Sequence, residues 1–492
     1  MNISITQSLL KRCAALTMLG LLLVPASMAK VAKVDGINYN YSTKTRVATV
    51  EQYDIQNLRD ENGNLVKDEN GKNVKDSTFY VGDIVIPPTV SIDGVDYPVV
   101  GTEAAAFQNC RDLTSVILPE SCVTIDNNTF NGCEKLANWP VPSTATKIGQ
   151  GSFVRCKSLT EAVIPAGVSG KLITGMFAEC TSLKKITFEA TTESTQLQLN
   201  YFVLSAPATA GYPPIEELYL YRQLSDPTAN NLSPFHNVTT LKKVVLGGEM
   251  TSVSSTMFQG CSALETVEFE DGNKITAIGS SAFASCKALQ SIDLPQAVTT
   301  IEASTFNGAT SLAAITMGDV TSIGVTAFYN TGLTSLDGIA ATVQTIGQQA
   351  FQNSKIAGDV TLPAALTAIG SQAFAGTQAT SFAIPAGVNS IGNAAFAPIE
   401  TLAAIHLDEG NEAFKVENGE LYNAAGTRLL VSAHEGEIGI ELNNETVESV
   451  DNYGLAFSPF ETVELPNVTS LGNYAFYKAA VKSFTIKAAT SL

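Results

Sequence analysis

The stretch AFQNCRDLTSVILPESCVTID, residues 106–126, holds one copy of the pattern that decides the fold. A later stretch, AFAGTQATSFAIPAGVNSIG at residues 373–392, repeats the same order of residue types. In both, an Ala-Phe pair precedes a small residue, an alternating apolar segment that ends in proline, and a second apolar segment that ends in isoleucine. A pattern that returns at a fixed period indicates a repeat architecture.

Phenylalanine marks each copy along the chain. Its intervals are 22 to 25 residues within each of two series. The regular positions are Phe107, Phe130, Phe153, Phe177, Phe235, Phe258, Phe283, Phe306, Phe328, Phe351, Phe374 and Phe396. Phe202, Phe457 and Phe476 are expected to continue the series less regularly, which makes fifteen copies.

The repeat is too short to fold alone. Its alternating apolar segment predicts a short strand, the proline ends that strand, and a glycine allows the corner into the next Ala-Phe. A unit of this length must stack on its neighbours to bury its apolar side. We therefore expect a repeat solenoid with a parallel β-sheet on one face, rather than a set of globular catalytic domains.

The quoted stretch and AFASCKALQSIDLPQAVTTIEASTF, residues 282–306, resemble the BspA-like leucine-rich repeats of bacterial surface proteins. The resemblance covers roughly residues 80–490. It implies a curved leucine-rich-repeat solenoid that is exported and often displayed on the cell surface. Members of the family are associated with adhesion to host matrix proteins or to other cells, or have uncharacterised roles, and they share no catalytic residues.

Six cysteines occupy one slot of the repeat, three residues after the phenylalanine. They are Cys110, Cys133, Cys156, Cys180, Cys261 and Cys286. Other copies place Ala309, Thr331, Ser354 or Thr377 there, so the slot selects small volume rather than thiol chemistry. Cys122 takes a different inward slot. Disulfides between neighbouring coils are the alternative, but stacked side chains are spaced too widely for good disulfide geometry, so we expect reduced thiols.

Residues 1–29 have the layout of a secretory signal peptide. Lys11 and Arg12 precede a short apolar run, and Ser27 and Ala29 precede the expected cleavage point. Removal of this segment leaves 27 basic and 47 acidic residues, a net charge of 27 − 47 = −20. Such a surface disfavours binding to nucleic acid or to anionic lipid. We expect an exported protein, secreted or at the cell surface, with no transmembrane segment after the signal.

The remaining chain divides into a cap and the repeats. Residues 30–100 lack the period and are expected to form an N-terminal β cap, whereas 101–492 form the solenoid. Asn62-Gly63 and Asn70-Gly71 favour hairpin turns or a mobile loop over a calcium site, because the spacing of the EF-hand loop is missing. Insertions are expected near 191–234 and 411–436.

The C-terminal stretch FTIKAATSL shows no polar cap. Either the sequence was cut there, or the end is covered by a partner or another copy, which raises the possibility of end-to-end self-association.

No catalytic, metal or cofactor motif stands out. His236, His406 and His434 share no pattern, and hydrolase, protease and phosphate-loop signatures are missing. Trp139 falls at an inward position and is expected to be core. We expect no enzyme activity, no cofactor and no metal.

Binding chemistry is then expected on the outward side of the sheet. The residue two before the repeat proline points outward. This column reads Ile117, Pro140, Val163, Thr187, Tyr219, Val245, Glu268, Asp293, Thr316, Asp337, Thr361, Ala383, His406, Glu464 and Thr485. Its apolar and aromatic part suggests a binding stripe centred on Tyr219. Its members are Ile117, Val163, Tyr219, Tyr221, Arg222 and Val245; the alternative is that inserted loops cover them.

The sequence thus favours an exported, non-enzymatic binding or adhesion scaffold for an extracellular protein or polysaccharide. The alternatives are a surface glycan-processing enzyme or accessory protein, and a self-assembling structural surface protein.

Overall fold

The computed structural model describes residues 30–52, 55–57, 75–77, 79–172, 175–191, 197–199, 213–225, 235–433 and 441–486. The chain forms two compact units, Met1–Cys156 and Lys157–Leu492. The expected signal peptide, both Asn-Gly turns, Phe202 and His434 lie outside the described residues, as does most of the insertion at 191–234.

A mixed sheet opens the first unit. β1 (Lys30–Val34), β2 (Ile37–Ser42) and β3 (Val47–Val50) pair antiparallel, and β3 then pairs parallel with β8 (Val95–Thr102). β7 (Thr89–Ile92) lies antiparallel to β8. The parallel strands β10 (Thr124–Ile125) and β11 (Lys147–Ile148) extend the same sheet into the first coils. This continuity supports the interpretation of residues 30–100 as a cap, because it gives the first coil a hydrogen-bonded neighbour.

Two shorter sheets complete the first unit. β6 (Gly82–Val85) pairs parallel with β9 (Leu113–Ile117), and β4 (Ile55–Asn57) pairs antiparallel with β5 (Lys75–Ser77). The next coil lacks a strand after β9. Instead, the side-chain amide of Asn138 donates to the carbonyl of Val116 (2.7 Å) and accepts from its N–H (3.0 Å). One side chain thereby replaces a backbone partner of β9.

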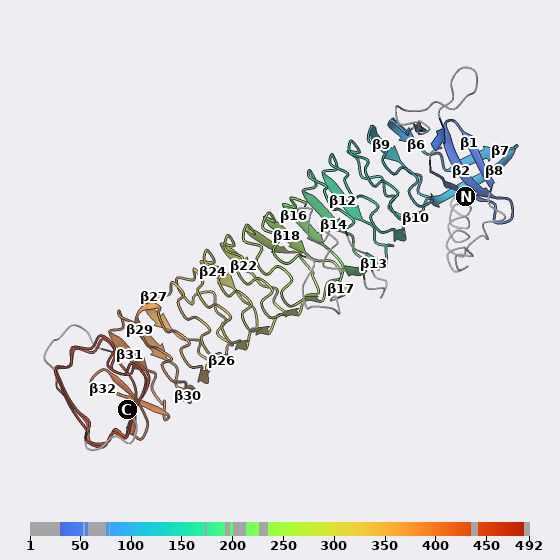
Figure 1. Ribbon diagram of the computed structural model, residues 1–492. Coiled ribbons are helices and arrows are strands. Elements are labelled where there is room, and N and C mark those ends of the chain that lie inside the picture. The colour runs from blue at the N-terminus through green and yellow to red at the C-terminus, as the bar shows by residue number, and fades with distance from the viewer. Residues whose placement is uncertain are drawn as a thin grey trace, which may run out of the picture. The chain divides into compact units, whose positions relative to one another are not determined.

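In the second unit, the predicted strands form an outer row of parallel sheets (Figure 1). One sheet contains β12 (Glu161–Ile164), β14 (Lys185–Phe188), β16 (Glu217–Leu220), β18 (Lys243–Leu246) and β20 (Thr266–Phe269). The other sheets of the row are β22 (Ser291–Asp293) with β24 (Ala314–Thr316); β27 (Ala357–Thr361), β29 (Gln378–Ile384) and β31 (Ala404–Leu407); and β35 (Glu441–Asn443), β37 (Thr462–Glu464) and β39 (Ser483–Thr485). The predicted parallel sheet is confirmed.

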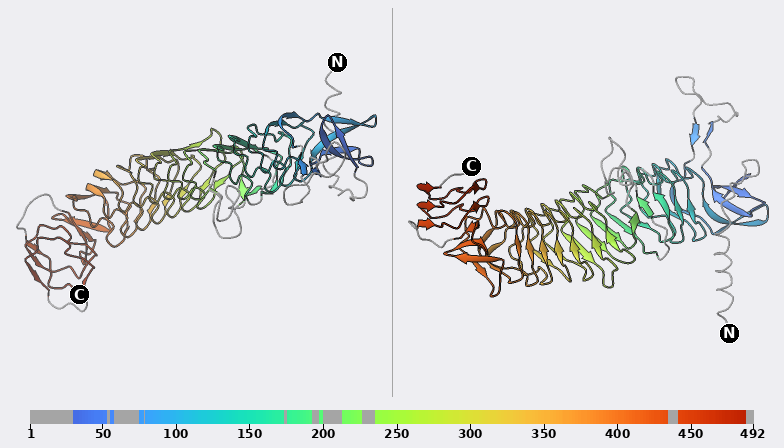
Figure 2. Two further views of the ribbon diagram at one scale, coloured as in Figure 1. Left: turned by 45° about the horizontal axis from the view of Figure 1, so that its top comes forward. Right: turned by 90° about the horizontal axis from the view of Figure 1, so that it is seen from below.

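A second row of parallel strands, which the sequence analysis did not predict, runs along another side of the same coils. These strands are two to five residues long and carry the isoleucine or valine that follows the proline corner. They are β13 (Gly170–Leu172), β15 (Leu197–Leu199) and β17 (Leu224–Ser225); β19 (Ser252–Val253) and β21 (Ala277–Ile278); β23 (Thr300–Ile301), β25 (Ser322–Ile323), β26 (Thr345–Ile346), β28 (Ala368–Ile369) and β30 (Ser390–Ile391); and β34 (Arg428–Ser432), β36 (Ser449–Val450) and β38 (Ser470–Leu471). Figure 2 shows the coils between the two rows stacked on one another.

The turn that holds the repeat phenylalanine forms a third side of each coil. Residues two before and two after the phenylalanine adopt left-handed backbone, such as Gln349 (φ 56°) and Asn353 (φ 58°) around Phe351. The N–H groups of these three residues all point toward the next coil and donate to its carbonyl oxygens at 2.8–2.9 Å. We call this side the turn row.

The phenylalanine rings stack inside the turn row. From Phe235 to Phe396, ring centroids of successive coils lie 5.2–6.0 Å apart with interplanar angles of 6–19°. In the first unit, Phe107, Phe130 and Phe153 stack in the same way. Each ladder confirms within its own unit that successive repeats share one interior.

The ladder differs from the prediction near the C-terminal coils. Leu455, which is fully buried, donates its N–H to Ala475 and stands between the left-handed residues Tyr453 and Phe457. Leu455 therefore fills the phenylalanine slot, whereas Phe457 lies two residues later and is only half-buried. The Ala-Phe letters at 456–457 are out of register with the repeat, so the assignment of Phe457 was wrong.

An antiparallel hairpin interrupts the repeats between β31 and β36. β32 (Phe414–Glu417) pairs with β33 (Glu420–Asn423), which pairs with β34. Both nitrogens of an Arg428 fork lie 2.7 Å from the carboxylate oxygens of Asp451. This bidentate pair joins the hairpin to the coil of β36, and it holds the pKa of Arg428 above its usual value.

Candidate binding surface

The predicted outward column runs across the five-stranded sheet of the second unit. The strand register places Val163, Thr187, Tyr219, Val245 and Glu268 opposite one another on β12, β14, β16, β18 and β20. The sheet itself follows from alternation, since the residues on either side of each of these point into the core. The arrangement brings one aromatic ring, Tyr219, to the centre of an outward row.

Tyr219 is held in place by charged neighbours. Its hydroxyl donates to Glu217 at 2.9 Å, and Lys185 Nζ lies 4.9 Å from its ring centroid. The hydrogen bond to Glu217 raises the pKa of Tyr219, and partial burial and the Glu217 charge add to that effect. The ring is therefore fixed from two sides, which lowers the conformational entropy that a ligand would need to remove.

Tyr221 follows directly after β16, at the corner where most coils have proline. Its ring centroid lies 6.4 Å from that of Tyr219 with an interplanar angle of 50°. Burial raises the pKa of Tyr221, and the charge and hydrogen bond of Glu270 raise it further. The two tyrosines form a pair of tilted rings, each tied to a carboxylate.

Lysines and glutamates alternate from strand to strand around these rings. Glu216 bridges Lys184 and Lys242, each at 2.9 Å, and Lys243 pairs with Glu268 at 2.8 Å. Their side chains remain between 29% and 61% exposed, so the pairs add little to stability. We call the group Lys185, Glu217, Tyr219, Tyr221, Lys243 and Glu268 the tyrosine patch.

Two predicted members of the binding stripe are buried, which corrects the expectation. Val245 is 6% exposed because its short side chain stands between Tyr219 and Glu268 on the adjacent strands. Arg222 is 1% exposed because its coil turns inward after β16. Neither can contact a ligand on the outer surface, whereas Val163 is half-buried and remains part of that surface.

Ile117 belongs to the first unit. It is 56% exposed and lies opposite Val85, which is 67% exposed, in the register of β6 and β9. Of the rest of the predicted column, only Pro140 is buried. Trp139, beside it, is half-buried with its ring 4.5 Å from that of Phe153, so the expectation of a core tryptophan holds in part.

The cysteine slot is interior, as predicted. All seven cysteines of the described chain are buried free thiols, which confirms the prediction of reduced cysteines. The Sγ atom of Cys133 donates to the carbonyl of Phe107 at 3.0 Å, and Cys156, Cys261 and Cys286 make the same contact with the preceding phenylalanine at 3.1–3.2 Å. Burial raises the pKa of Cys110, Cys122 and Cys261 to about 12. A thiol with so high a pKa is not a nucleophile at neutral pH.

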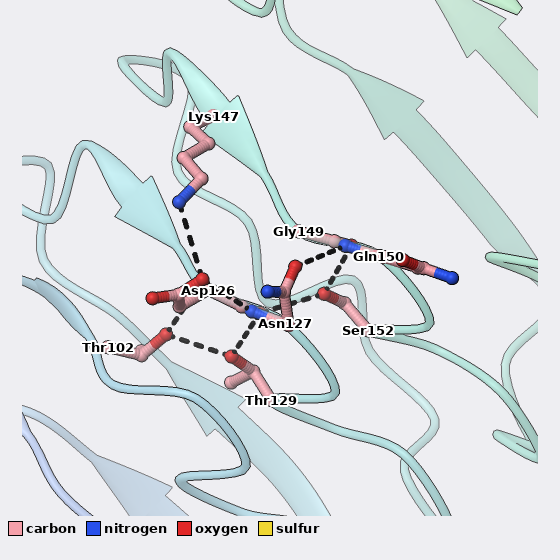
Figure 3. A network of polar contacts seen from close by, with 8 residues as sticks. All are labelled: Thr102, Asp126, Asn127, Thr129, Lys147, Gly149, Gln150 and Ser152. Atoms are coloured by element: carbon pink, nitrogen blue, oxygen red, sulfur yellow. Dashed lines mark hydrogen bonds and ion pairs between the residues drawn. The ribbon is translucent and has the colours of Figure 1, made fainter. Parts of the chain in front are cut away.

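A polar network in the first unit joins groups that could suggest chemistry (Figure 3). Asp126 accepts from Lys147 Nζ at 3.3 Å, while the buried hydroxyls of Thr129 and Ser152 both donate to the backbone carbonyl of Asp126. Thr129 and Thr102 also lie 3.0 Å apart. Because the buried hydroxyls bond the backbone of adjacent coils, the network fixes coil spacing rather than a reacting group.

The remaining polar candidates are scattered. His406 is exposed on β31, whereas burial lowers the pKa of His236 on the turn row. Across the described ranges, no cluster of three His, Cys, Asp or Glu side chains is arranged to hold a metal ion. The same part of the chain contains no helix that could cross a membrane. The tyrosine patch is therefore the site with the best-defined geometry.

Comparisons with known proteins agree with this architecture. A family model described as the BspA type leucine rich repeat region matches residues 100–204, 231–357, 321–418 and 438–491, in six copies. No curated protein matches the chain.

Among solved structures, a leucine-rich repeat protein from Eubacterium ventriosum is 27% identical over 40% of this chain, with a TM-score of 0.36. This chain spans 56% of the length of that protein. A leucine-rich repeat protein from Bacteroides ovatus is 23% identical over 66% of this chain and 98% of its own, with a TM-score of 0.23. A leucine rich cell surface protein from Faecalibacterium prausnitzii is 17% identical over 92% and 76%, with a TM-score of 0.27.

Proposed function

This chain belongs to the BspA-type leucine-rich repeat family, and from that premise we propose that it is an exported, non-enzymatic scaffold that binds an extracellular protein or polysaccharide. The tyrosine patch is the binding surface. The observation that carries the proposal is the fixed tyrosine pair on an outward sheet, Tyr219 and Tyr221 with ring centroids 6.4 Å apart.

The chemistry of the patch suits recognition. Tyrosine offers a large apolar face and a polar tip at low entropic cost, and it is enriched at binding hot spots. Lys185 and Lys243 place cations beside Glu217 and Glu268, so the patch carries donors and acceptors of both signs around the rings. Either a peptide or the ring of a sugar could pack against such a surface.

Binding fits the described side chains better than catalysis. The carboxylates of the patch pair with lysines or with tyrosine hydroxyls, and the buried thiols have raised pKa values. A reacting site needs a nucleophile or acid–base pair in reach of substrate. The patch supplies contact area and complementary charge instead.

The test begins with a screen of the mature protein against extracellular matrix proteins and glycans. For any ligand found, Tyr219→Ala and Tyr221→Ala should each weaken affinity about tenfold or more, the effect of losing a hot-spot aromatic. Tyr474→Ala is the matched control, because Tyr474 is 67% exposed and lies outside the patch. Unchanged affinity in both patch variants, with thermal stability intact, would reject the patch.

Export is a separate part of the proposal. The signal-like sequence predicts cleavage after Ala29, so the secreted or surface protein should begin at Lys30. Sequencing the N-terminus of protein isolated from the cell exterior checks this. A mature chain that retains Met1 would count against it.

End-to-end self-association stays a proposal with its own test. The core residues Leu471, Phe476 and Phe484 of the 470–486 coil are only partly buried, so a second copy could cover apolar surface there. Sedimentation over a wide concentration range measures this. A strict monomer at high concentration would reject it.

A further inference from the structure

Arg222 is the largest fully buried side chain in the protein, at 1% exposure. It lies in the second unit between β16 and β17. Arginine is almost never buried without a partner, because transfer of an unpaired charge from water into the interior is strongly unfavourable. Its environment therefore calls for a counter-charge.

A shortened connection explains how this side chain enters the interior. Three residues, 221–223, join β16 to β17, whereas five residues join β12 to β13 and another five join β18 to β19. In the longer connections, the fully buried Val168 and Met250 fill the core at the corner. The shorter connection has no apolar residue to place there, and Arg222 takes that position.

The guanidinium makes one hydrogen bond in the described protein. Its Nη1 donates to the carbonyl of Pro165 at 3.3 Å. Pro165 belongs to the coil of β12, two strands away in the sheet order β12–β14–β16, so the side chain extends along the stack across an intervening coil. Nε and Nη2, which form one edge of the guanidinium fork, have no hydrogen-bond partner.

The nearby carboxylate of Glu189 does not neutralise this charge. Glu189 Oε2 accepts from the N–H of Ala166 at 3.2 Å. That N–H and the carbonyl bound by Arg222 belong to the same peptide group, and in a trans peptide they point in opposite directions. The peptide thus stands between the two charges, and among the residues described no carboxylate pairs with Arg222.

Proton loss does not remove the charge. Burial lowers the pKa of Arg222, and burial is its only resolved cause. Arginine nevertheless starts so far above neutral pH that it stays protonated in proteins. The interior of this coil therefore holds a cation with an unused bidentate edge.

We propose that the Nε–Nη2 edge of Arg222 binds a small oxyanion from solution inside the second unit. The two parallel N–H groups of that edge match two oxygens of a carboxylate or of a similar planar anion. The ligand is small, because the guanidinium is enclosed by protein. This site is separate from the tyrosine patch and does not depend on the binding function proposed for it.

Thermal unfolding of the mature protein in different sodium salts at constant ionic strength tests the site. Sodium formate is the probe, sodium fluoride is the reference, and sodium chloride separates a halide site from an oxyanion site. A ligand that binds only the folded state raises Tm in a saturable way. We expect formate to raise Tm by several degrees over fluoride, and chloride to raise it less.

Arg222→Met is the matched variant, since methionine fills similar volume without charge. It should lose the formate-dependent shift and be more stable than the wild type in fluoride. Equal salt responses of the two proteins would overturn the proposal, as would a chloride shift as large as the formate shift.

Equilibrium dialysis of wild-type protein with radiolabelled formate keeps the test independent of that variant. One bound formate per chain supports the site. No saturable binding at millimolar formate overturns it.

Discussion

The slot three residues after the repeat phenylalanine shows how a single atom decides which small residue is best. Cysteine in this slot reaches back to the carbonyl of the preceding coil, as Cys133 does at 3.0 Å. Thr331 instead bonds the carbonyl of its own Phe328 at 3.1 Å. The hydroxyls of Ser354 and Thr377 are buried without a hydrogen-bond partner. Volume explains why all these residues fit, and hydrogen bonding explains why they are not equivalent.

Ser354→Cys should therefore stabilise the protein by about 1 kcal/mol, because it replaces a buried unpaired hydroxyl with a less polar group that can reach a carbonyl. Thr331→Cys is the control, since its hydroxyl already has a partner and should gain nothing. Denaturant unfolding measures both. A Ser354→Cys protein less stable than the wild type would contradict the argument.

The buried thiols also make stability depend on alkaline pH. Folding raises the pKa of Cys110, Cys122 and Cys261 from 9.0 to about 12, because burial disfavours the thiolate. Their stabilising contribution is fully present below pH 9 and is lost as pH rises toward 12. Each thiol should remove about 1.4 kcal/mol of unfolding free energy per pH unit in that window.

Unfolding curves at pH 8, 9 and 10 check this expectation. The double variant Cys110→Ala, Cys261→Ala should show a shallower alkaline decline than the wild type, although it is less stable at neutral pH. An identical decline in both proteins would show that other groups dominate.

At the C-terminal coils, one position separates the repeat from its apparent motif. Leu455→Ala should cost about 3 kcal/mol, since Leu455 is fully buried in the phenylalanine slot. Phe457→Ala should cost clearly less, because Phe457 is half-buried and packs edge-on against Tyr477. Comparing their Tm values tests the register; a larger loss for Phe457→Ala would return the slot to that residue.

Among the elements, the second row of strands depends on glycine. A Cβ on Gly370 would overlap the backbone of Gly347 and Gln348 in the preceding coil, so that close approach requires glycine. Gly387 sits at an open corner, where a Cβ would lie 3.3 Å from the carbonyl of Leu366. The two glycines are 17 residues apart in sequence but face opposite demands.

Gly370→Ala should lower the free energy of unfolding by about 1–3 kcal/mol through overpacking, whereas Gly387→Ala should change it by less than about 0.5 kcal/mol. Chemical denaturation of both variants gives the comparison. Equal losses would mean that backbone entropy, not coil contact, sets the effect.

These elements also show what could be foreseen. The outer row was predictable because its strands carry three or more alternating residues before a proline. The second row was not, since a strand of two residues such as Thr345–Ile346 leaves no period to detect. Val245 and Arg222 were misplaced for a related reason: their burial depends on side chains of neighbouring coils and on a corner shortened by two residues. Tyr219 was placed correctly because alternation alone fixes its direction.

At the scale of the whole molecule, charge opposes compactness. The net charge is −18, while ion pairs such as Lys482–Glu461 join side chains that are 71% and 38% exposed. Surface pairs of this kind contribute about 0–1 kcal/mol each. Repulsion among the excess carboxylates acts over longer distances and is the part that salt screens most completely.

Raising sodium chloride from low concentration to about 0.1 M, where the screening length is about 10 Å, should therefore raise Tm rather than lower it. Differential scanning calorimetry measures the shift. A fall in Tm would mean that the lysine–glutamate ladders outweigh the repulsion.

The turn row has one more consequence. Between Phe235 and Phe396, peptide groups of successive coils point the same way, N–H toward the C-terminal coils and C=O toward the N-terminal ones. Aligned in this manner, their dipoles add as they do in an α-helix. The second unit thus carries a permanent electrical polarity along its coils, positive toward the Phe396 coil, which no change of pH removes and which would orient any charged molecule that approaches either end.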